Sequence, residues 1–176
     1  YATQGEGMDY QSLIRDIPDY PKPGIVFKDL TGIWKDPLAH QTSAREIADH
    51  FRNQRITKVA AAEARGFITG SLVAADLGAG FLPVRKPGKL PWETISETYD
   101  LEYGTDTLEM HIDAVSPGDR VLLVDDLVAT GGTLAAVVRM IRRQGGEAVG
   151  VGALVCLDFL RPGDRLDIPV FSLVHY

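Results

Sequence analysis

The sequence predicts an α/β fold in which helices flank a central, mainly parallel sheet. Three observations support this prediction: short apolar runs, segments of helical spacing between them, and glycines where the two kinds of segment meet. Strands of a parallel sheet are buried on both faces, so they read as continuous apolar runs. The 176 residues are 45% apolar and 24% charged, as expected for about one globular domain.

The N-terminal part carries weaker signals. Residues 1–7 are small and polar, and we expect them to be a non-native leader or a disordered tail ahead of Met8. Residues 8–176 are expected to form a single domain. Gln11 to Ile17 is expected to be a short helix ended by the proline that follows it. A turn rich in proline and glycine then leads to the apolar segment Ile25 to Phe27.

From residue 37 onward, helix and strand signals alternate. Apolar residues recur at helical spacing over residues 37–55, 66–77 and 132–144. Apolar runs predict strands at residues 58–62, 80–84, 121–124, 148–157 and 170–174. Residues 85–112 break the alternation, because they are polar and contain prolines and glycines. We expect a long excursion there, of the kind that forms a functional lid or stays irregular.

Composition excludes several classes of function. Lys and Arg number 18 and Asp and Glu number 24, so the net charge of −6 argues against a nucleic-acid partner. A single cysteine allows no disulfide within the chain and no four-thiolate zinc site. The four histidines are scattered, so no histidine-based metal site is expected. No apolar run reaches the ~18–20 residues of a membrane span, and we expect a cytoplasmic protein without membrane partners.

The segment Val121–Thr133, VLLVDDLVATGGT, carries most of the chemistry. A buried strand is expected to end at Asp125 and Asp126, and a short loop leads to a helix that starts near Gly132. Ligands of open α/β sheets bind at such strand ends, and a glycine-rich helix N-terminus with threonine hydroxyls suits a phosphate. The two acids can instead accept hydrogen bonds from vicinal hydroxyls. The segment therefore predicts a ribose 5-phosphate site, with a polar capped turn as the simpler alternative.

This segment resembles the phosphoribosyl pyrophosphate motif of the type I phosphoribosyltransferases, in which two acids precede A-T-G-G-T. Further segments resemble the members of that family that use adenine: PGIVFKD at 23–29, EARGF at 63–67, FLPVRKPGKLP at 81–91 and YDLEYG at 99–104. The resemblance implies the type I phosphoribosyltransferase fold, with a hood and a flexible loop. It also implies transfer of the phosphoribosyl group of 5-phosphoribosyl 1-pyrophosphate to adenine N9, giving AMP and pyrophosphate with Mg²⁺ as cofactor.

The resemblance assigns roles to matching residues. Asp125 and Asp126 would meet the ribose hydroxyls, and the 5′-phosphate would be held by Ala129, Thr130, Gly131, Gly132 and Thr133. Pyrophosphate would be bound by Arg65, Arg85, Lys86 and Lys89, of which Arg85 and Lys89 are the stronger candidates. The loop that contains Arg65 often carries a cis peptide bond in the family, and Glu63–Ala64 is the expected place.

The remaining roles concern the base and the proton. Glu102, on the flexible hood, would manage the ring proton of the purine during attack. Adenine would lie between Phe27 and Leu157, and backbone groups of Val26 and Lys28 would read its edge. The metal would be held mainly by substrate oxygens and water, so no protein ligand is assigned to it. A homodimer is expected from the family.

Two alternatives stay open. The first is a phosphoribosyltransferase for another base, such as xanthine, guanine or orotate; the L-E-Y-G and R-K-x-G-K-L-P segments favour adenine. The second is a regulator that keeps the fold without catalysis. Such regulators usually add a DNA-binding domain, and the length and charge of this chain argue against one.

Overall fold

The computed structural model describes residues 7–100 and 104–176 of the chain. They group into two compact units that meet in sequence between Ser43 and Ala44, and each unit is described by itself. The expected leader over residues 1–7 and the expected single domain over 8–176 both stay predictions. Glu102 lies outside the described residues.

The N-terminal unit is built on a small antiparallel hairpin. After a single 3₁₀ turn, η1 (Gln11–Leu13), strand β1 (Arg15–Pro18) pairs with β2 (Val26–Asp29). The expected helix over residues 11–17 is therefore wrong. A helix of seven residues is too short to be stable by itself, and the Pro/Gly turn returns the chain so that Ile17 pairs with Phe27. A short helix that the sequence did not predict, α1 (Thr31–Lys35), precedes α2 (Pro37–Phe51).

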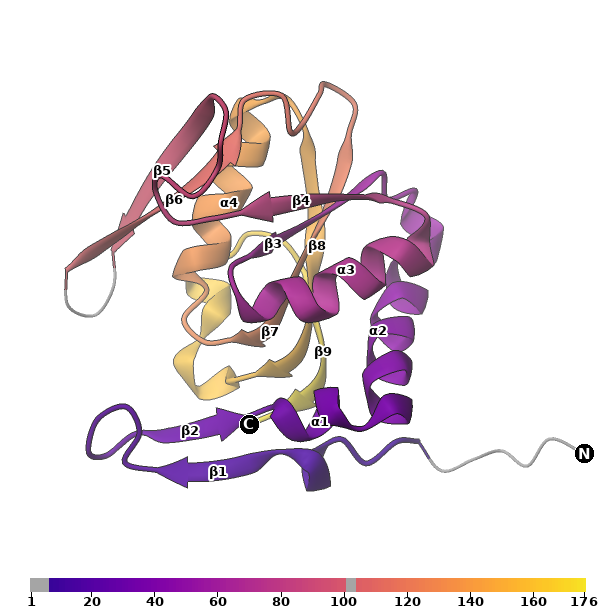
Figure 1. Cartoon of the computed structure of the whole chain (residues 1–176), viewed down its shortest axis with the longest axis vertical. Helices are drawn as coiled ribbons and strands as arrows, with labels where there is room; N and C mark the ends of the chain where they lie inside the picture. Colours follow the sequence, from indigo (N-terminus) through magenta and orange to yellow (C-terminus); the bar gives the residue numbers. More distant parts are fainter. Residues whose placement is uncertain (1–6, 101–103) are drawn as a thin grey trace, which may run out of the picture. The chain divides into compact units, whose positions relative to one another are not determined.

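The C-terminal unit contains a five-stranded sheet in the order β4-β3-β7-β8-β9 (Figure 1). Every neighbouring pair in it is parallel, which confirms the predicted fold class. Its strands are β3 (Lys58–Ala62), β4 (Gly80–Val84), β7 (Arg120–Val128), β8 (Glu147–Cys156) and β9 (Val170–His175). The apolar runs predicted each of them, and the bounds of β3 and β4 match the prediction.

Strand β7 is longer than expected. The sequence predicts its end at Val124, where the apolar run stops, but pairing with β8 continues to Val128 opposite Cys156. Asp125 and Asp126 therefore lie within the paired strand, and the loop to the next helix begins only after Val128. Main-chain hydrogen bonds to a neighbouring strand do not depend on side-chain polarity, so a polar residue does not by itself end a buried strand.

Two helices pack on opposite faces of the sheet (Figure 1). Helix α3 (Arg65–Leu77) lies close to the face that carries Ala61 and Val124, because an added Cβ on Gly70 would stand 2.9 and 3.7 Å from their side chains. Helix α4 (Gly132–Arg143) shares a core with the alternate positions, among them Ala60 and Leu123. Both helices begin within one residue of the predicted start. Single 3₁₀ turns lie after α2, as η2 (Arg52–Gln54), and between β8 and β9, as η3 (Asp158–Leu160) and η4 (Pro162–Asp164).

Part of the long excursion expected over 85–112 is a β-hairpin, so the segment is not irregular throughout. Strands β5 (Thr94–Asp100) and β6 (Thr105–His111) pair in register, from Thr94 opposite His111 to Asp100 opposite Thr105. Tyr99, Leu108 and Met110 are buried in the core beside α4. Alternate residues of the two strands face this core, and that two-residue period was the signal the sequence reading missed.

Among the described residues, no helix is long and apolar enough to cross a membrane.

Candidate active site

The two acids of β7 occupy different environments at the carboxyl end of the sheet. Asp126 is 2% exposed, and its Oδ2 accepts no hydrogen bond within the described chain. Arg65 Nε lies 3.1 Å from that oxygen, which makes an ion pair without hydrogen-bond alignment. Asp125 is half-buried, and its Oδ1 accepts a hydrogen bond of 2.9 Å from the Asp126 amide. Both carboxylates therefore keep capacity for further donors.

Burial is the main influence on the pKa of both carboxyl groups. It raises the pKa of Asp125 well above the ordinary value, and the negative charge of Asp126 raises it further. Burial also raises the pKa of Asp126, although the positive charge of Arg65 opposes this shift. Ligand-free protein therefore holds two acids in positions where donors or a cation would favour their charged forms.

The loop after β7 forms a small cradle at the start of α4. A cavity of about 90 Å³ is lined by Asp125 and by residues 127–134 without interruption. Gly131 is the N-cap, with φ +80, and no side chain caps the helix. The first amides of a helix have no intrahelical acceptor, and the first such bond here is from Ala135 to Gly131 O at 2.9 Å. The cradle therefore offers amides and the Thr130 hydroxyl to an anion, while the Thr133 hydroxyl, which also lines it, donates to Tyr99.

The loop between β3 and α3 brings Arg65 to the same end of the sheet. The Glu63–Ala64 peptide bond is cis, which confirms the expected position. Arg65 is the first residue of α3, and Gly66 follows it against the acid pair. An added Cβ on Gly66 would stand 3.1 Å from Asp125 Oδ1, so any larger residue would crowd the Asp125 carboxylate.

The cationic residues after β4 do not behave alike. Arg85 Nε donates to Glu63 Oε2 at 2.7 Å, and the Lys86 amide donates to Glu63 Oε1 at 2.9 Å. The Lys86 ammonium forms an ion pair with Asp106 on β6, while Lys89 is exposed. Burial alone would raise the pKa of Glu63, but these two donors outweigh it and hold the pKa below its ordinary value. The charged carboxylate of Glu63 therefore holds the start of the Arg85–Lys89 turn through two hydrogen bonds.

A second cavity, of about 270 Å³, joins these elements. Of the residues predicted from the sequence it brings together Arg65, Lys86, Asp125, Asp126, Ala129 and Thr133. Arg85 and Lys89 do not line it. Among the described residues, the charged side chains that line it are three acids, Glu63 included, and two cations. The cavity is thus lined by charges of both signs, and an anionic ligand there needs further positive charge.

The residues predicted to bind adenine fall in different units. In the N-terminal unit, Phe27 on β2 packs edge-on against Tyr20 with ring centroids 5.2 Å apart. Val26 is 51% exposed, and Lys28 Nζ donates to Asp16 at 2.7 Å. In the C-terminal unit, Leu157 follows β8 and its amide donates to Val128 O at 2.9 Å.

The sequence reading missed two side chains that connect the hairpin to the cavity. Thr133 Oγ1 donates to the Tyr99 hydroxyl at 3.3 Å, and that hydroxyl donates to Asp106 Oδ2 at 3.3 Å. Since Asp106 also pairs with Lys86, one chain of contacts runs from the α4 cradle across the hairpin to a cation of the cavity. The alternation of β5 and β6 would have placed Tyr99 on the inner face.

Comparisons with known proteins agree with this geometry. Residues 34–171 match the family model of the phosphoribosyl transferase domain. The chain is 55% identical over 169 residues to an adenine phosphoribosyltransferase of Escherichia coli O1:K1 / APEC, covering 94% of this chain and 92% of that relative.

Solved structures give the same result. The adenine phosphoribosyltransferase of Thermoanaerobacter pseudethanolicus has a TM-score of 0.92 and 47% identity, covering 95% of this chain and 98% of that one. The enzyme of Saccharomyces cerevisiae has a TM-score of 0.89 and 34% identity, covering 93% and 96%. The yeast structure is complexed with D-2,5-dideoxy-2,5-imino-altritol 1,6-bisphosphate and adenine.

Proposed function

The chain belongs to the phosphoribosyltransferase family, and from this premise we propose that it transfers the phosphoribosyl group of 5-phosphoribosyl 1-pyrophosphate to adenine. The products are AMP and pyrophosphate, so the enzyme is a pentosyltransferase of purine salvage. The observation that carries this function is the 270 Å³ cavity, in which Arg65, Lys86 and the two acids of β7 meet the start of the phosphate cradle. Relatives that match nearly the whole chain have the same activity in their names.

The 5′-phosphate would bind in the 90 Å³ cradle at residues 129–133. Amides at the uncapped start of α4 and the positive end of its dipole suit an anion. Gly131 lets the loop reach the helix in a left-handed conformation, which residues with a side chain rarely adopt.

The ribose hydroxyls would donate to Asp125 and Asp126. Asp126 Oδ2 supports this proposal, because a buried carboxylate oxygen that accepts no hydrogen bond is costly until a donor arrives. Displacement at the anomeric carbon passes through a state with oxocarbenium character. Nearby carboxylates would stabilise the positive charge that develops there.

Pyrophosphate would leave toward Arg65 and Lys86, with Arg85 and Lys89 at the rim. Three carboxylates around the cavity and a highly charged leaving group call for an additional cation, and this supports Mg²⁺ as cofactor. Mg²⁺ keeps several waters and binds through substrate phosphates, so most of its ligands would come from substrate and water. When bound, Mg²⁺ would lower the cost of charge on the departing pyrophosphate.

Adenine would bind against Phe27 and Leu157, with the backbone of Val26 and Lys28 at its edge. This assignment follows the motif P-G-I-V-F-K-D and is supported by the adenine in the yeast relative. Adenine carries an amino group where hypoxanthine and guanine carry a carbonyl, so the site must accept a hydrogen bond there. Backbone carbonyls can do so without any diagnostic side chain.

Glu102 would act on the purine ring proton as the hood closes. The assignment rests on the L-E-Y-G segment, residues 101–104. A Glu102→Gln variant keeps the size of the side chain but cannot take up a proton, and general acid–base catalysis contributes about 10²–10⁴-fold. We therefore expect kcat to fall by about 100-fold or more while KM for 5-phosphoribosyl 1-pyrophosphate changes little. An unchanged kcat would remove Glu102 from the chemistry.

A base panel tests the function. Adenine, hypoxanthine, guanine, xanthine and orotate are each incubated with 5-phosphoribosyl 1-pyrophosphate and Mg²⁺, and pyrophosphate release is followed. Clear preference for adenine is expected. Preference for another base would favour the first alternative, and no release with any base would favour a regulator without catalysis. The family further supports a cytoplasmic homodimer.

A further inference from the structure

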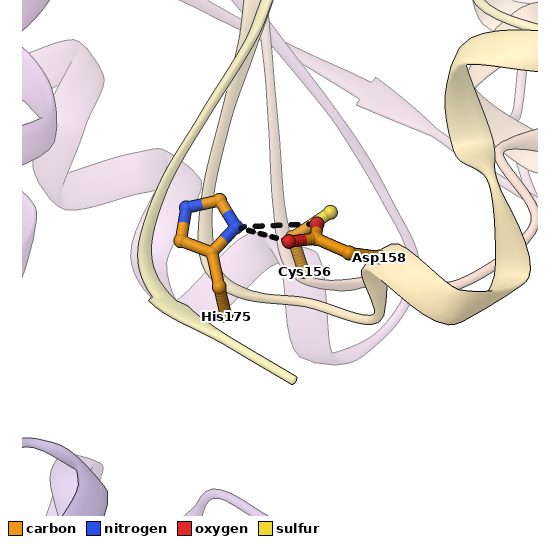
Figure 2. A group of neighbouring side chains, drawn as sticks. All are labelled: Cys156, Asp158 and His175. Atoms are coloured by element: carbon orange, nitrogen blue, oxygen red, sulfur yellow. Dashed lines mark hydrogen bonds and ion pairs between the residues drawn. The ribbon is translucent and has the colours of Figure 1, made fainter.

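Three side chains of different metal-ligand types meet where strands β8 and β9 end. Cys156 is the last residue of β8, Asp158 follows two residues later, and His175 ends β9. Their ligand atoms, one from each residue, all lie within 4.8 Å of one another, and Figure 2 shows the three side chains gathered at one point. Within the described chain, no other group of three or more such side chains is brought this close.

The backbone holds the three residues in place. Cys156 and His175 are direct partners in the parallel register of β8 and β9. The Asp158 amide donates to Tyr176 O at 2.8 Å, and the Tyr176 amide donates to Cys156 O at 3.0 Å. Strand pairing therefore sets the positions of Cys156 and His175, and a main-chain hydrogen bond ties Asp158 beside them, so a ligand that binds here has little backbone ordering to impose.

The side chains already contact one another. His175 Nδ1 lies 3.1 Å from Asp158 Oδ2 and 3.2 Å from Oδ1. Asp158 and His175 are 58% and 51% exposed, whereas Cys156 is buried. One ligand thus lies inside the fold and two lie at its surface, which leaves an open side for water.

A reactive cysteine is the other use such a group could have, and the surroundings argue against it. Burial, together with the carboxylate of Asp158, raises the pKa of the Cys156 thiol to about 12. Because Cys156 is also buried, reagents have little access to its thiol, and buried structural cysteines are inert.

We propose that Cys156, Asp158 and His175 bind one Zn²⁺ ion or a similar divalent transition-metal ion, with water as the fourth ligand. Thiolate, imidazole and carboxylate are the groups that bind Zn²⁺, at about 2.3, 2.0–2.1 and 2.0–2.2 Å. A tetrahedral ion with these bonds keeps its ligand atoms about 3.3–3.8 Å apart. The ligand atoms of the cluster, all within 4.8 Å of one another, are already near this spacing. Mg²⁺ and Ca²⁺ prefer oxygen ligands and do not suit this mixture.

No local sequence pattern indicates this site, because its three residues become neighbours only through the pairing of β8 and β9. Two of them lie two residues apart, but the histidine comes 17 residues after the aspartate. The expectation of no histidine-based metal site was drawn from spacing along the chain, and spacing does not report on the register of parallel strands.

Calorimetric titration of the metal-free full chain, without a histidine tag, tests the proposal. We expect one Zn²⁺ per chain and a higher unfolding temperature in its presence. Co²⁺ should bind at the same site and give the absorption band of a cobalt–thiolate bond. A large excess of Mg²⁺ should not displace either ion.

Substitutions of single residues test which side chains bind the ion. Loss of an outer-shell partner costs metal sites about 10–100-fold in affinity, so Cys156→Ser and His175→Ala should each weaken Zn²⁺ binding by at least 100-fold. His40→Ala, which changes a histidine outside the cluster, should leave the affinity unchanged. Because His175 is half exposed, its variant keeps the test decisive if Cys156→Ser does not fold. Absence of Zn²⁺ binding by the wild type, absence of the thiolate band, or equal affinity in His175→Ala would each overturn the proposal.

Discussion

At the residue scale, the two acids of β7, Asp125 and Asp126, lower the stability of the folded protein. Asp126 is almost completely buried with Arg65 as its ion-pair partner, and Asp125 lies directly beside it. Two adjacent carboxylates in a buried site repel each other when both are charged. A ligand with hydroxyl donors, or a cation, relieves this repulsion, so the cost is of the kind expected for a binding site and not for a structural turn.

Replacing Asp125 with Asn should stabilise the ligand-free protein at neutral pH. The pKa of Asp125 is raised in the folded state, so its favourable contribution is present below the ordinary value of 3.8 and is lost as the pH rises through the folded pKa. Asn stays neutral, and its Oδ1 can still accept the Asp126 amide. In urea unfolding, we expect Asp125→Asn to exceed the wild type in free energy of unfolding at pH 7.

The control for this prediction is Asp113→Asn, which changes an exposed acid of the same unit. The difference in free energy of unfolding between Asp125→Asn and the wild type should shrink as the pH falls toward 3.8. The free energy of unfolding of Asp113→Asn should stay equal to that of the wild type. Equal stability of Asp125→Asn and wild type at every pH would contradict the stated origin of the cost.

The two lysines of the Arg85–Lys89 turn should differ in their effect on substrate binding. Lys86 lines the cavity and Lys89 is exposed outside it. A hydrogen bond to a charged group contributes about 1.5–3 kcal/mol, which corresponds to roughly 10–100-fold in affinity. In steady-state kinetics, Lys86→Ala should raise KM for 5-phosphoribosyl 1-pyrophosphate by about that factor. Lys89→Ala serves as the matched change and should have a smaller effect; the reverse order would contradict the geometry.

At the element scale, the turn between β7 and α4 depends on Gly131. Its φ of +80 is left-handed, and an added Cβ would stand 3.0 Å from Leu166 Cγ and 3.2 Å from Pro162 O. The left-handed conformation alone costs other residues about 1–2 kcal/mol. We expect Gly131→Ala to lower the free energy of unfolding by at least that amount in urea titration.

Gly163→Ala is the matched control for the glycine prediction. Nothing lies within 4 Å of the Cβ that this change would add, and Gly163 has no positive φ. Its effect should stay within about 0.5 kcal/mol, as for most surface substitutions. If both alanine variants have the same stability, the turn does not require a glycine at 131.

The bounds of the elements also show which parts of the fold can be predicted from sequence patterns. Strands β3 and β4 and helices α3 and α4 were predicted within a residue, because an apolar run or a glycine cap sets their bounds locally. The end of β7 and the hairpin β5–β6 were not, because pairing with another segment decides them. The candidate site divides in the same way. The cradle residues are contiguous in sequence, but Tyr99 and Asp106 join it only through the hairpin.

At the scale of the whole molecule, the net charge of −6 and an anionic substrate are compatible. The cavity does not need a basic surface, since amides at the start of α4, two cationic side chains and a metal ion would supply the positive charge locally. Whole-chain charge argues against a nucleic-acid partner, but it says nothing about such a site.

The proposed homodimer has a direct test. The chain has a mass of 19.2 kDa, so light scattering during gel filtration should give about twice that value. The family resemblance is the basis of this expectation. A mass that stays near 19.2 kDa at micromolar concentration would contradict it.

The most direct test of the account is the rate of AMP formation from adenine, 5-phosphoribosyl 1-pyrophosphate and Mg²⁺, measured for the wild type and for an Asp125→Asn, Asp126→Asn double variant. The wild type should form AMP. The double variant should fold but lose kcat/KM for 5-phosphoribosyl 1-pyrophosphate by about 100-fold or more, because two hydrogen bonds to charged groups contribute about 1.5–3 kcal/mol each. No AMP from the wild type, or equal kcat/KM in the folded double variant, would contradict the assignment of this cavity as the active site.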